Sequence, residues 1–147
     1  DMLAEYGDSD LLCYRADSPI ELVQRQNEHW DPVLDWAASE LNVRLQTRSG
    51  IQHQPQDAEA LQSLRARVQG LSAFHLAAFH DLVSMSGSLI LGFAAAAGWR
   101  SAAEIWTLSR LDETWQEEQW GPDEEAQAEA EIKRLAFLHT KRFYDFS

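Results

Sequence analysis

Apolar residues recur along most of the chain with the spacing of amphipathic helices. Leu34, Ala37, Ala38 and Leu41 lie at positions i, i+3, i+4 and i+7, which places them on one side of a helix. Residue types that cap helices, such as Ser, Asp and Gly, stand at the ends of these segments. The pattern predicts helices over residues 18–29, 32–41, 57–70, 73–97 and 101–121, and a last helix that begins at residue 123.

Two prolines mark the breaks that we expect at the start of this helical part. Ser18 precedes Pro19, which is typical of an N-cap followed by proline at the first helical position. Asp31 and Pro32 repeat the arrangement. Because the residue before a proline avoids the α region, the sequence predicts that the path of the chain bends or breaks between residues 29 and 32.

The segment 73–97 is apolar on most of its faces. A helix of this kind is typical of the centre of a bundle, and Gly92 with the alanines after it would allow another helix to approach closely. Ser72 before the segment and Gly98 after it are typical caps. The longest apolar run, residues 89–97, is too short to cross a membrane.

Two short segments have an extended pattern. Residues 11–15 form an apolar run between polar residues, and residues 43–47 alternate with period two. They could pair with each other or with a domain outside this chain. We therefore expect a mainly α fold, a helical bundle domain over residues 18–147 with one or two short β-strands. Residues 1–17 and 43–52 would then be short extended segments at the edge of a small, largely missing α+β N-terminal domain.

The charge balance excludes several classes of partner. The 147 residues include 24 acids and 12 Lys and Arg, for a formal net charge of -12, and 45% of the residues are hydrophobic. The hydrophobic fraction is typical of a folded domain rather than a disordered chain. An acidic domain repels phosphate backbones and anionic lipids, so we expect no nucleic-acid partner and no membrane partner. A protein with a basic face fits better.

No residue pattern is typical of catalysis. His75 and His80 are five residues apart and cannot share a helix face as metal ligands. Cys13 is the one cysteine in the sequence, so it can form no internal disulfide. Residues 86–88, Ser-Gly-Ser, lie inside a predicted helix rather than on a strand-to-helix elbow. We therefore expect no enzyme activity, no catalytic residue, no metal, no cofactor and no small-molecule substrate.

The predicted helix 101–121 has two apolar faces. At 100° per residue, one face contains Leu108, Leu111 and Trp115, and the opposite face contains Trp106, Glu113 and Trp120. We expect the first face, with Trp115, to enter the core. Nine of the 24 acids lie between residues 112 and 131, with no Lys or Arg among them. The second face could dock a partner, or it could pack inside the bundle beside a solvated acidic helix start.

Five motifs in order resemble a known family. They are Leu-Leu-Cys-Tyr-Arg-Ala at 11–16, Arg-Gln at 25–26, Trp-Asp-Pro-Val-Leu-Asp-Trp-Ala at 30–37, Ser-Gly-Ser-Leu at 86–89 and Leu-Asp-Glu-Thr-Trp-Gln-Glu-Glu-Gln-Trp-Gly at 111–121. Together they resemble the assembly chaperones of the catalytic sector of F-type ATP synthase, in particular the family that handles the α subunit. The resemblance extends from about residue 10 to residue 146.

The resemblance implies a chaperone that is not an enzyme. Members of this family hold the new ATP synthase α subunit soluble until β subunits displace them during hexamer assembly, in the mitochondrial matrix or in the bacterial cytoplasm. Their small N-terminal domain precedes a helical C-terminal domain. The residues that we expect to contact the partner are Asp112, Glu113, Gln116, Glu117, Gln119 and Trp120. The alternative is a generic acidic helical interaction module with another client.

Overall fold

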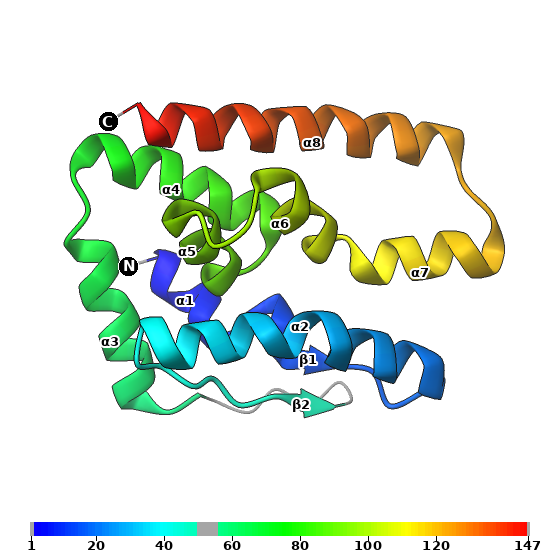
Figure 1. Cartoon of the computed structure of the whole chain (residues 1–147), viewed down its shortest axis with the longest axis horizontal. Coiled ribbons are helices and arrows are strands. Elements are labelled where there is room, and N and C mark those ends of the chain that lie inside the picture. Colours follow the sequence, from blue (N-terminus) through cyan, green and yellow to red (C-terminus); the bar gives the residue numbers. More distant parts are fainter. Residues whose placement is uncertain (1, 50–55, 147) are drawn as a thin grey trace.

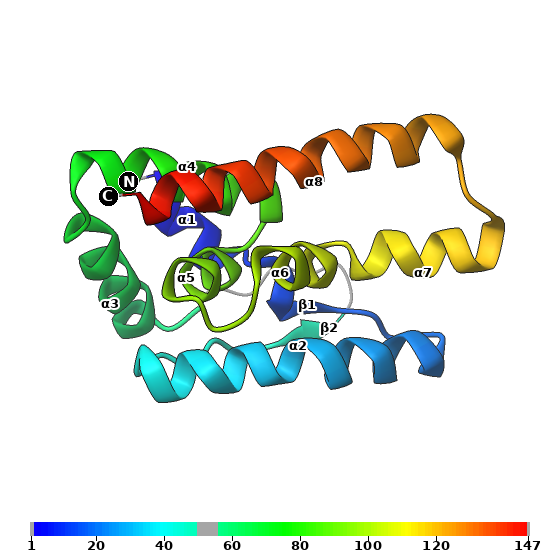
Figure 2. The ribbon, with the colours of Figure 1, turned by 45° about the horizontal axis from the view of Figure 1, so that its top comes forward.

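The computed structural model describes residues 2–49 and 56–146 (Figure 1). Its elements in chain order are α1 (Met2–Asp8), the 3-10 turn η1 (Leu11–Cys13), β1 (Tyr14–Arg15), α2 (Ile20–Glu40), β2 (Arg48–Ser49), α3 (Ala58–Gln69), α4 (Ala73–Ser86), α5 (Leu89–Ala97), α6 (Ala102–Ser109), α7 (Leu111–Trp120) and α8 (Glu124–Asp145). The mainly α class with one short sheet is as predicted. The helix α5 lies at the centre, in contact with α1, α2, α4, α6 and α8 (Figures 1 and 2).

Four predicted N-caps are confirmed. The N-cap residues of α3, α4, α6 and α8 are Asp57, Ser72, Ser101 and Asp123, in that order. The side chain of each accepts a hydrogen bond from a backbone N–H group in the first turn of its helix. Each bond satisfies an N–H group that has no partner inside the helix. The local sequence therefore positions the starts of these helices correctly.

The expectation that residues 1–17 are extended is wrong in part. Residues 2–8 form α1, because Leu3 is buried and Gly7 lies close to α3 and α5. A Cβ at Gly7 would lie 3.1 Å from Leu61 and 3.3 Å from Leu89. The packing of α1 against these two helices thus determines its conformation.

The two short strands pair in parallel, Tyr14 with Arg48 and Arg15 with Ser49. The predicted strand at 43–47 is wrong, although Val43 and Leu45 are buried in alternation as the pattern indicates. The side chain of Gln56 bonds to both backbone groups of Gln46, with two distances of 2.9 Å, and so occupies groups that a neighbouring strand would need. Residues 50–52 of the predicted segment lie outside the described residues, and the division into domains stays a prediction.

The break predicted between residues 29 and 32 is also wrong, since α2 continues through Pro32. Trp30, Val33 and Leu34 are buried along one side of α2, and this packing offsets the backbone bond that the proline removes. Pro19, rather than Ser18, is the N-cap residue of α2.

The predicted helix 73–97 is two helices. The first of them, α4, ends before Gly87, whose φ of 73° is a value that favours glycine. Ser88 then caps α5 by accepting a bond from the Leu91 N–H at 2.9 Å. Close approach at Gly92 is confirmed, because a Cβ there would lie 2.7 Å from Val83 Cγ2 on α4.

The predicted helix 101–121 is likewise divided, at Arg110, into α6 and α7. The φ and ψ of Arg110, -103° and 12°, are not helical. The buried Trp30 of α2 donates a hydrogen bond from Nε1 to the Leu108 carbonyl at 2.9 Å. This bond holds the end of α6, and therefore the point at which α7 leaves the body.

Candidate partner-binding site

The helix α7 extends away from the body of the molecule. Figures 1 and 2 show α7 and the first turns of α8 at one end of the molecule, beside the N-terminal part of α2. Leu111, the first residue of α7, is buried, and among residues 113–120 all except the half-buried Trp115 and Glu117 are exposed. A few side chains therefore attach α7 to the rest of the protein.

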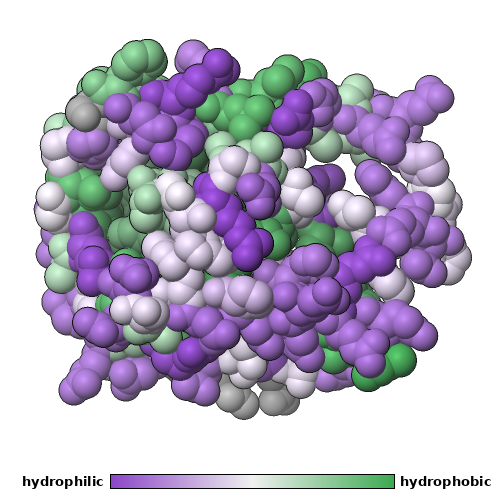
Figure 3. Space-filling model, in the orientation of Figure 1, coloured by the Kyte–Doolittle hydropathy of each residue, from purple (hydrophilic) through white to green (hydrophobic). Residues whose placement is uncertain are grey.

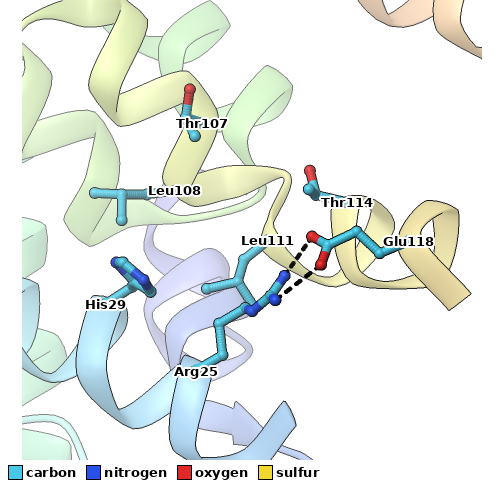
Figure 4. Close-up of a pocket in the computed structure, with 7 residues that line it drawn as sticks. All are labelled: Arg25, His29, Thr107, Leu108, Leu111, Thr114 and Glu118. Atoms are coloured by element: carbon cyan, nitrogen blue, oxygen red, sulfur yellow. Dashed lines mark hydrogen bonds and ion pairs between the residues drawn. The ribbon is translucent and has the colours of Figure 1, made fainter. Parts of the chain in front are cut away.

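Arg25 of α2 makes the first of these attachments. Its guanidinium binds both carboxylate oxygens of Glu118, at 2.6 and 2.9 Å (Figure 4), and lies 4.9 Å from the centre of the Trp115 ring. The hydrogen bonds from Arg25 hold the pKa of Glu118 below its usual value. The expectation that Trp115 enters the core is wrong, because the break at Arg110 turns α7 outward and Trp115 meets Arg25 instead.

Gln26, the next residue along α2, makes the second attachment. It is buried, its Oε1 accepts a bond from the Ala16 N–H at 2.8 Å, and its Nε2 donates to Asp112 at 2.8 Å. Asp112 is half-buried and uses one carboxylate oxygen in this bond. The chain segment after β1, the helix α2 and the helix α7 are therefore linked through one amide side chain.

The predicted contact residues lie on the remaining surface of α7. Glu113, Gln116 and Gln119 are exposed, Glu117 is half-buried, and Trp120 is 87% exposed. The sequence predicted that Trp106 lies on the same helix face as Glu113 and Trp120, and this prediction is wrong. Trp106 is buried on α6, with its ring 5.6 Å from that of Phe137, because the break at Arg110 separates it from α7.

Two grooves flank α7. The groove between α2 and α7 has a volume of about 330 Å³ and is lined by Arg25, His29, Thr107, Leu108, Leu111, Thr114 and Glu118 (Figure 4). The groove between α7 and α8, about 320 Å³, is lined by Trp106, Thr107, Arg110, Thr114, Glu117, Gln127, Ala130, Glu131 and Arg134. The surface is hollowed between α7 and α8 (Figure 3). The helix thus presents a ridge with a depression on each side.

Within residues 2–49 and 56–146, no three His, Cys, Asp or Glu side chains come together as a metal site. No helix in the same ranges is long and apolar enough to cross a membrane. Cys13 is buried, and burial, with the nearby Asp10 carboxylate, raises the pKa of its thiol to about 12, so it is not a nucleophile at neutral pH.

Comparison with known proteins shows what the chain is similar to. A family model described as ATP12 chaperone protein matches residues 1–38. The mitochondrial Atp12 protein of Schizosaccharomyces pombe is 29% identical over 131 residues, which cover 84% of this chain. The crystal structure of Atp12 from Paracoccus denitrificans matches 98% of this chain with a TM-score of 0.95 and 49% sequence identity. The chain is similar to ATP12 chaperones in sequence and in fold.

The relatives in the ATP12 family are longer than this chain. It spans 62% of the Paracoccus denitrificans protein and 45% of the Schizosaccharomyces pombe protein. The crystal structure of Atu1473 from Agrobacterium tumefaciens matches 97% of this chain and 53% of its own, with a TM-score of 0.89 and 40% identity. Because these matches extend over nearly all of the chain, α7 and its position at the end of the molecule are part of the ATP12 fold.

Proposed function

We propose that this chain is part of an assembly chaperone that binds the free α subunit of ATP synthase until β subunits join it in the catalytic hexamer. The observation that carries the proposal is α7, which lies at one end of the molecule (Figure 1) and exposes Trp120 within a sequence segment rich in acids. Similarity to ATP12 chaperones supports the chaperone role. The motifs at 30–37 and 111–121 support the α subunit as the client. The proposed function requires no catalytic step and no cofactor.

A subunit that waits for its partners exposes a surface that the partners later cover, and a large exposed apolar surface promotes aggregation. Trp is among the residues that supply most of the binding energy at interfaces. Carboxylates around Trp120 would attract a basic surface, which speeds encounter more than it tightens the complex. We propose that the client contacts are Asp112, Glu113, Gln116, Glu117, Gln119 and Trp120.

The proposal is tested by suppression of client aggregation. Purified ATP synthase α subunit is diluted from denaturant with this chain or with an unrelated acidic protein, and light scattering and co-elution are measured. We expect a stoichiometric loss of scattering with this chain and a complex that elutes as one peak. Equal protection of unrelated clients would contradict the proposal and favour a generic acidic interaction module.

A pair of variants locates the binding surface. Glu113→Lys with Gln116→Ala changes the exposed side of α7 and should weaken client binding while leaving thermal stability nearly unchanged. The matched control is Glu59→Lys with Gln62→Ala on α3, because Glu59 and Glu113 are both acids in the first turn of a helix and both pairs are exposed. Equal effects of the two double variants on binding would show that charge in general, rather than α7, attracts the client.

The compartment follows from the same proposal. The relatives include a mitochondrial protein and a protein of the bacterium Paracoccus denitrificans. We propose that the chain acts in the bacterial cytoplasm, or in the mitochondrial matrix if its source is eukaryotic. These are the compartments in which newly made α subunits await assembly.

A further inference from the structure

The groove between α2 and α7 has an apolar floor and a charged rim. Leu108 and Leu111 form the floor, and the Arg25–Glu118 ion pair lies at the rim, with its two side chains extending toward each other from α2 and α7 (Figure 4). The volume of about 330 Å³ is at the small end of the range for ligand pockets, roughly 300–1,000 Å³. It suits one apolar side chain rather than a cofactor.

The cation at this rim comes from α2, because α7 has none of its own. Residues 112–131 include nine acids and no Lys or Arg. The Arg25 and Glu118 side chains are 31% and 46% exposed, and exposed ion pairs contribute little to stability. A second cation that reaches the rim from solvent can therefore replace Arg25 with little loss of folding free energy.

We propose that the groove binds an apolar side chain of the client, and that an adjacent Lys or Arg of the client displaces Arg25 from Glu118. This inference rests on the proposed function and names the chemistry of the client segment, an apolar residue beside a basic one. Charge complementarity supports this occupant, because both α7 and the chain as a whole are strongly acidic. Displacement of Arg25 would also uncover the ring of Trp115.

Two variants of the same ion pair separate displacement from a structural role. Arg25→Gln and Glu118→Gln both break the pair, so a purely structural role predicts that they change client binding in the same direction. If the client displaces Arg25, the two variants should change client binding in opposite directions. Arg25→Gln removes the side chain that competes with the client for Glu118, and Glu118→Gln removes the carboxylate that the client binds. The matched controls are Arg44→Gln and Asp35→Asn, which break an exposed ion pair of 2.9 Å between Asp35 on α2 and Arg44 in the segment after it.

The measurement is equilibrium binding of purified ATP synthase α subunit to the wild-type chain and each variant. We expect Arg25→Gln to lower the Kd about two- to fivefold, the range that an exposed ion pair allows. Glu118→Gln should raise the Kd about tenfold, because a charge-assisted hydrogen bond is lost. Thr114→Phe, which introduces a ring into the groove from an exposed position, should also raise it.

The outcomes distinguish this inference from the proposed function. If the wild-type chain binds the α subunit and both charge variants weaken binding alike, or neither changes it, displacement is wrong and the proposed function stands. If the wild-type chain does not bind the α subunit, both are overturned. Opposite shifts with unchanged controls would establish Glu118 as a client-binding residue.

Discussion

Asp10 is a fully buried carboxylate whose titration should make the stability of the protein depend on pH. It accepts hydrogen bonds from the Leu12 N–H at 3.0 Å, the Ser88 hydroxyl at 2.7 Å and the Ile90 N–H at 3.1 Å. It therefore ties the first part of the chain to the start of the central helix α5. Burial raises the pKa of Asp10 from 3.8 to about 6, and the hydrogen bonds limit the rise.

The sign of the effect follows from this direction. The folded state binds the proton more tightly than the unfolded state, because the folded pKa of Asp10 is about 6 and the reference value is 3.8. The stability from this group is therefore full below pH about 4 and is lost as the pH rises through about 6. A shift of about two pKa units corresponds to about 3 kcal/mol. The free energy of unfolding should fall by about that amount between pH 4 and pH 8 through Asp10 alone.

Asp10→Asn isolates this contribution, because the amide does not ionise and the other groups titrate alike in both proteins. Urea unfolding followed by circular dichroism would be measured from pH 4 to pH 8. At pH 4 the variant should be less stable than wild type by about 1–3 kcal/mol, because an amide cannot accept all the bonds that the carboxyl accepts. The difference should narrow, and can reverse, as the pH rises.

A second variant tests the cause of the shift. Ser88→Ala removes a hydrogen bond that lowers the pKa of Asp10, so the loss of stability in this variant should extend to higher pH than in wild type. A difference between wild type and Asp10→Asn that stays constant from pH 4 to pH 8 would refute the reasoning. It would mean that Asp10 has the same pKa in the folded and unfolded states.

Three further predictions concern the core. Gly92→Ala should lower the free energy of unfolding by about 1–2 kcal/mol despite its better helix propensity, since the new Cβ would lie 2.7 Å from Val83 Cγ2; a more stable variant would contradict this. The buried Cys13 thiol should resist alkylation at pH 8 until the chain unfolds, as mass spectrometry can show; rapid labelling of the folded protein would count against its burial. Trp30→Phe should lower the free energy of unfolding by about 2–4 kcal/mol in urea, because it removes the bond to the Leu108 carbonyl and leaves a cavity; a loss well under 1 kcal/mol would show that the core refills the space.

Most helix starts could be predicted from the sequence. Asp57, Ser72, Ser101 and Asp123 cap helices as their residue types predict, because an N-cap bond forms within one turn and needs no distant partner. The mainly α class followed from the same local signals. The concentration of acids at 112–131 is a property of the sequence itself, and it is one reason why we expect the client contacts on α7.

Helix continuity could not be predicted in the same way. The segment Ala73–Ala97 divides at Gly87, whereas α2 continues through Pro32 against the local preference. At Pro32 the burial of α2 residues outweighs the local signal, and such packing leaves no periodic pattern. The division at Gly87 comes from a left-handed glycine followed by the cap Ser88, a local signal inside a continuous apolar pattern. The division at Arg110 changed the predicted site most. Residues seven apart, such as Trp106, Glu113 and Trp120, share a face only on one continuous helix, and Trp106 and Trp120 lie on two different helices.

The sequence by itself determined where most of the helices other than α1 lie, where the acids gather and which family the motifs resemble. The tertiary structure decided which side of α7 faces solvent and what holds the helix in place. Arg25 and Glu118 are 93 residues apart, so no local pattern could pair them. The contact of Trp115 with Arg25 and the exposure of Trp120 both follow from the direction in which α7 leaves the body. The direction of α7 is set by the break at Arg110 and by contacts with α2, and both exist only in the folded chain.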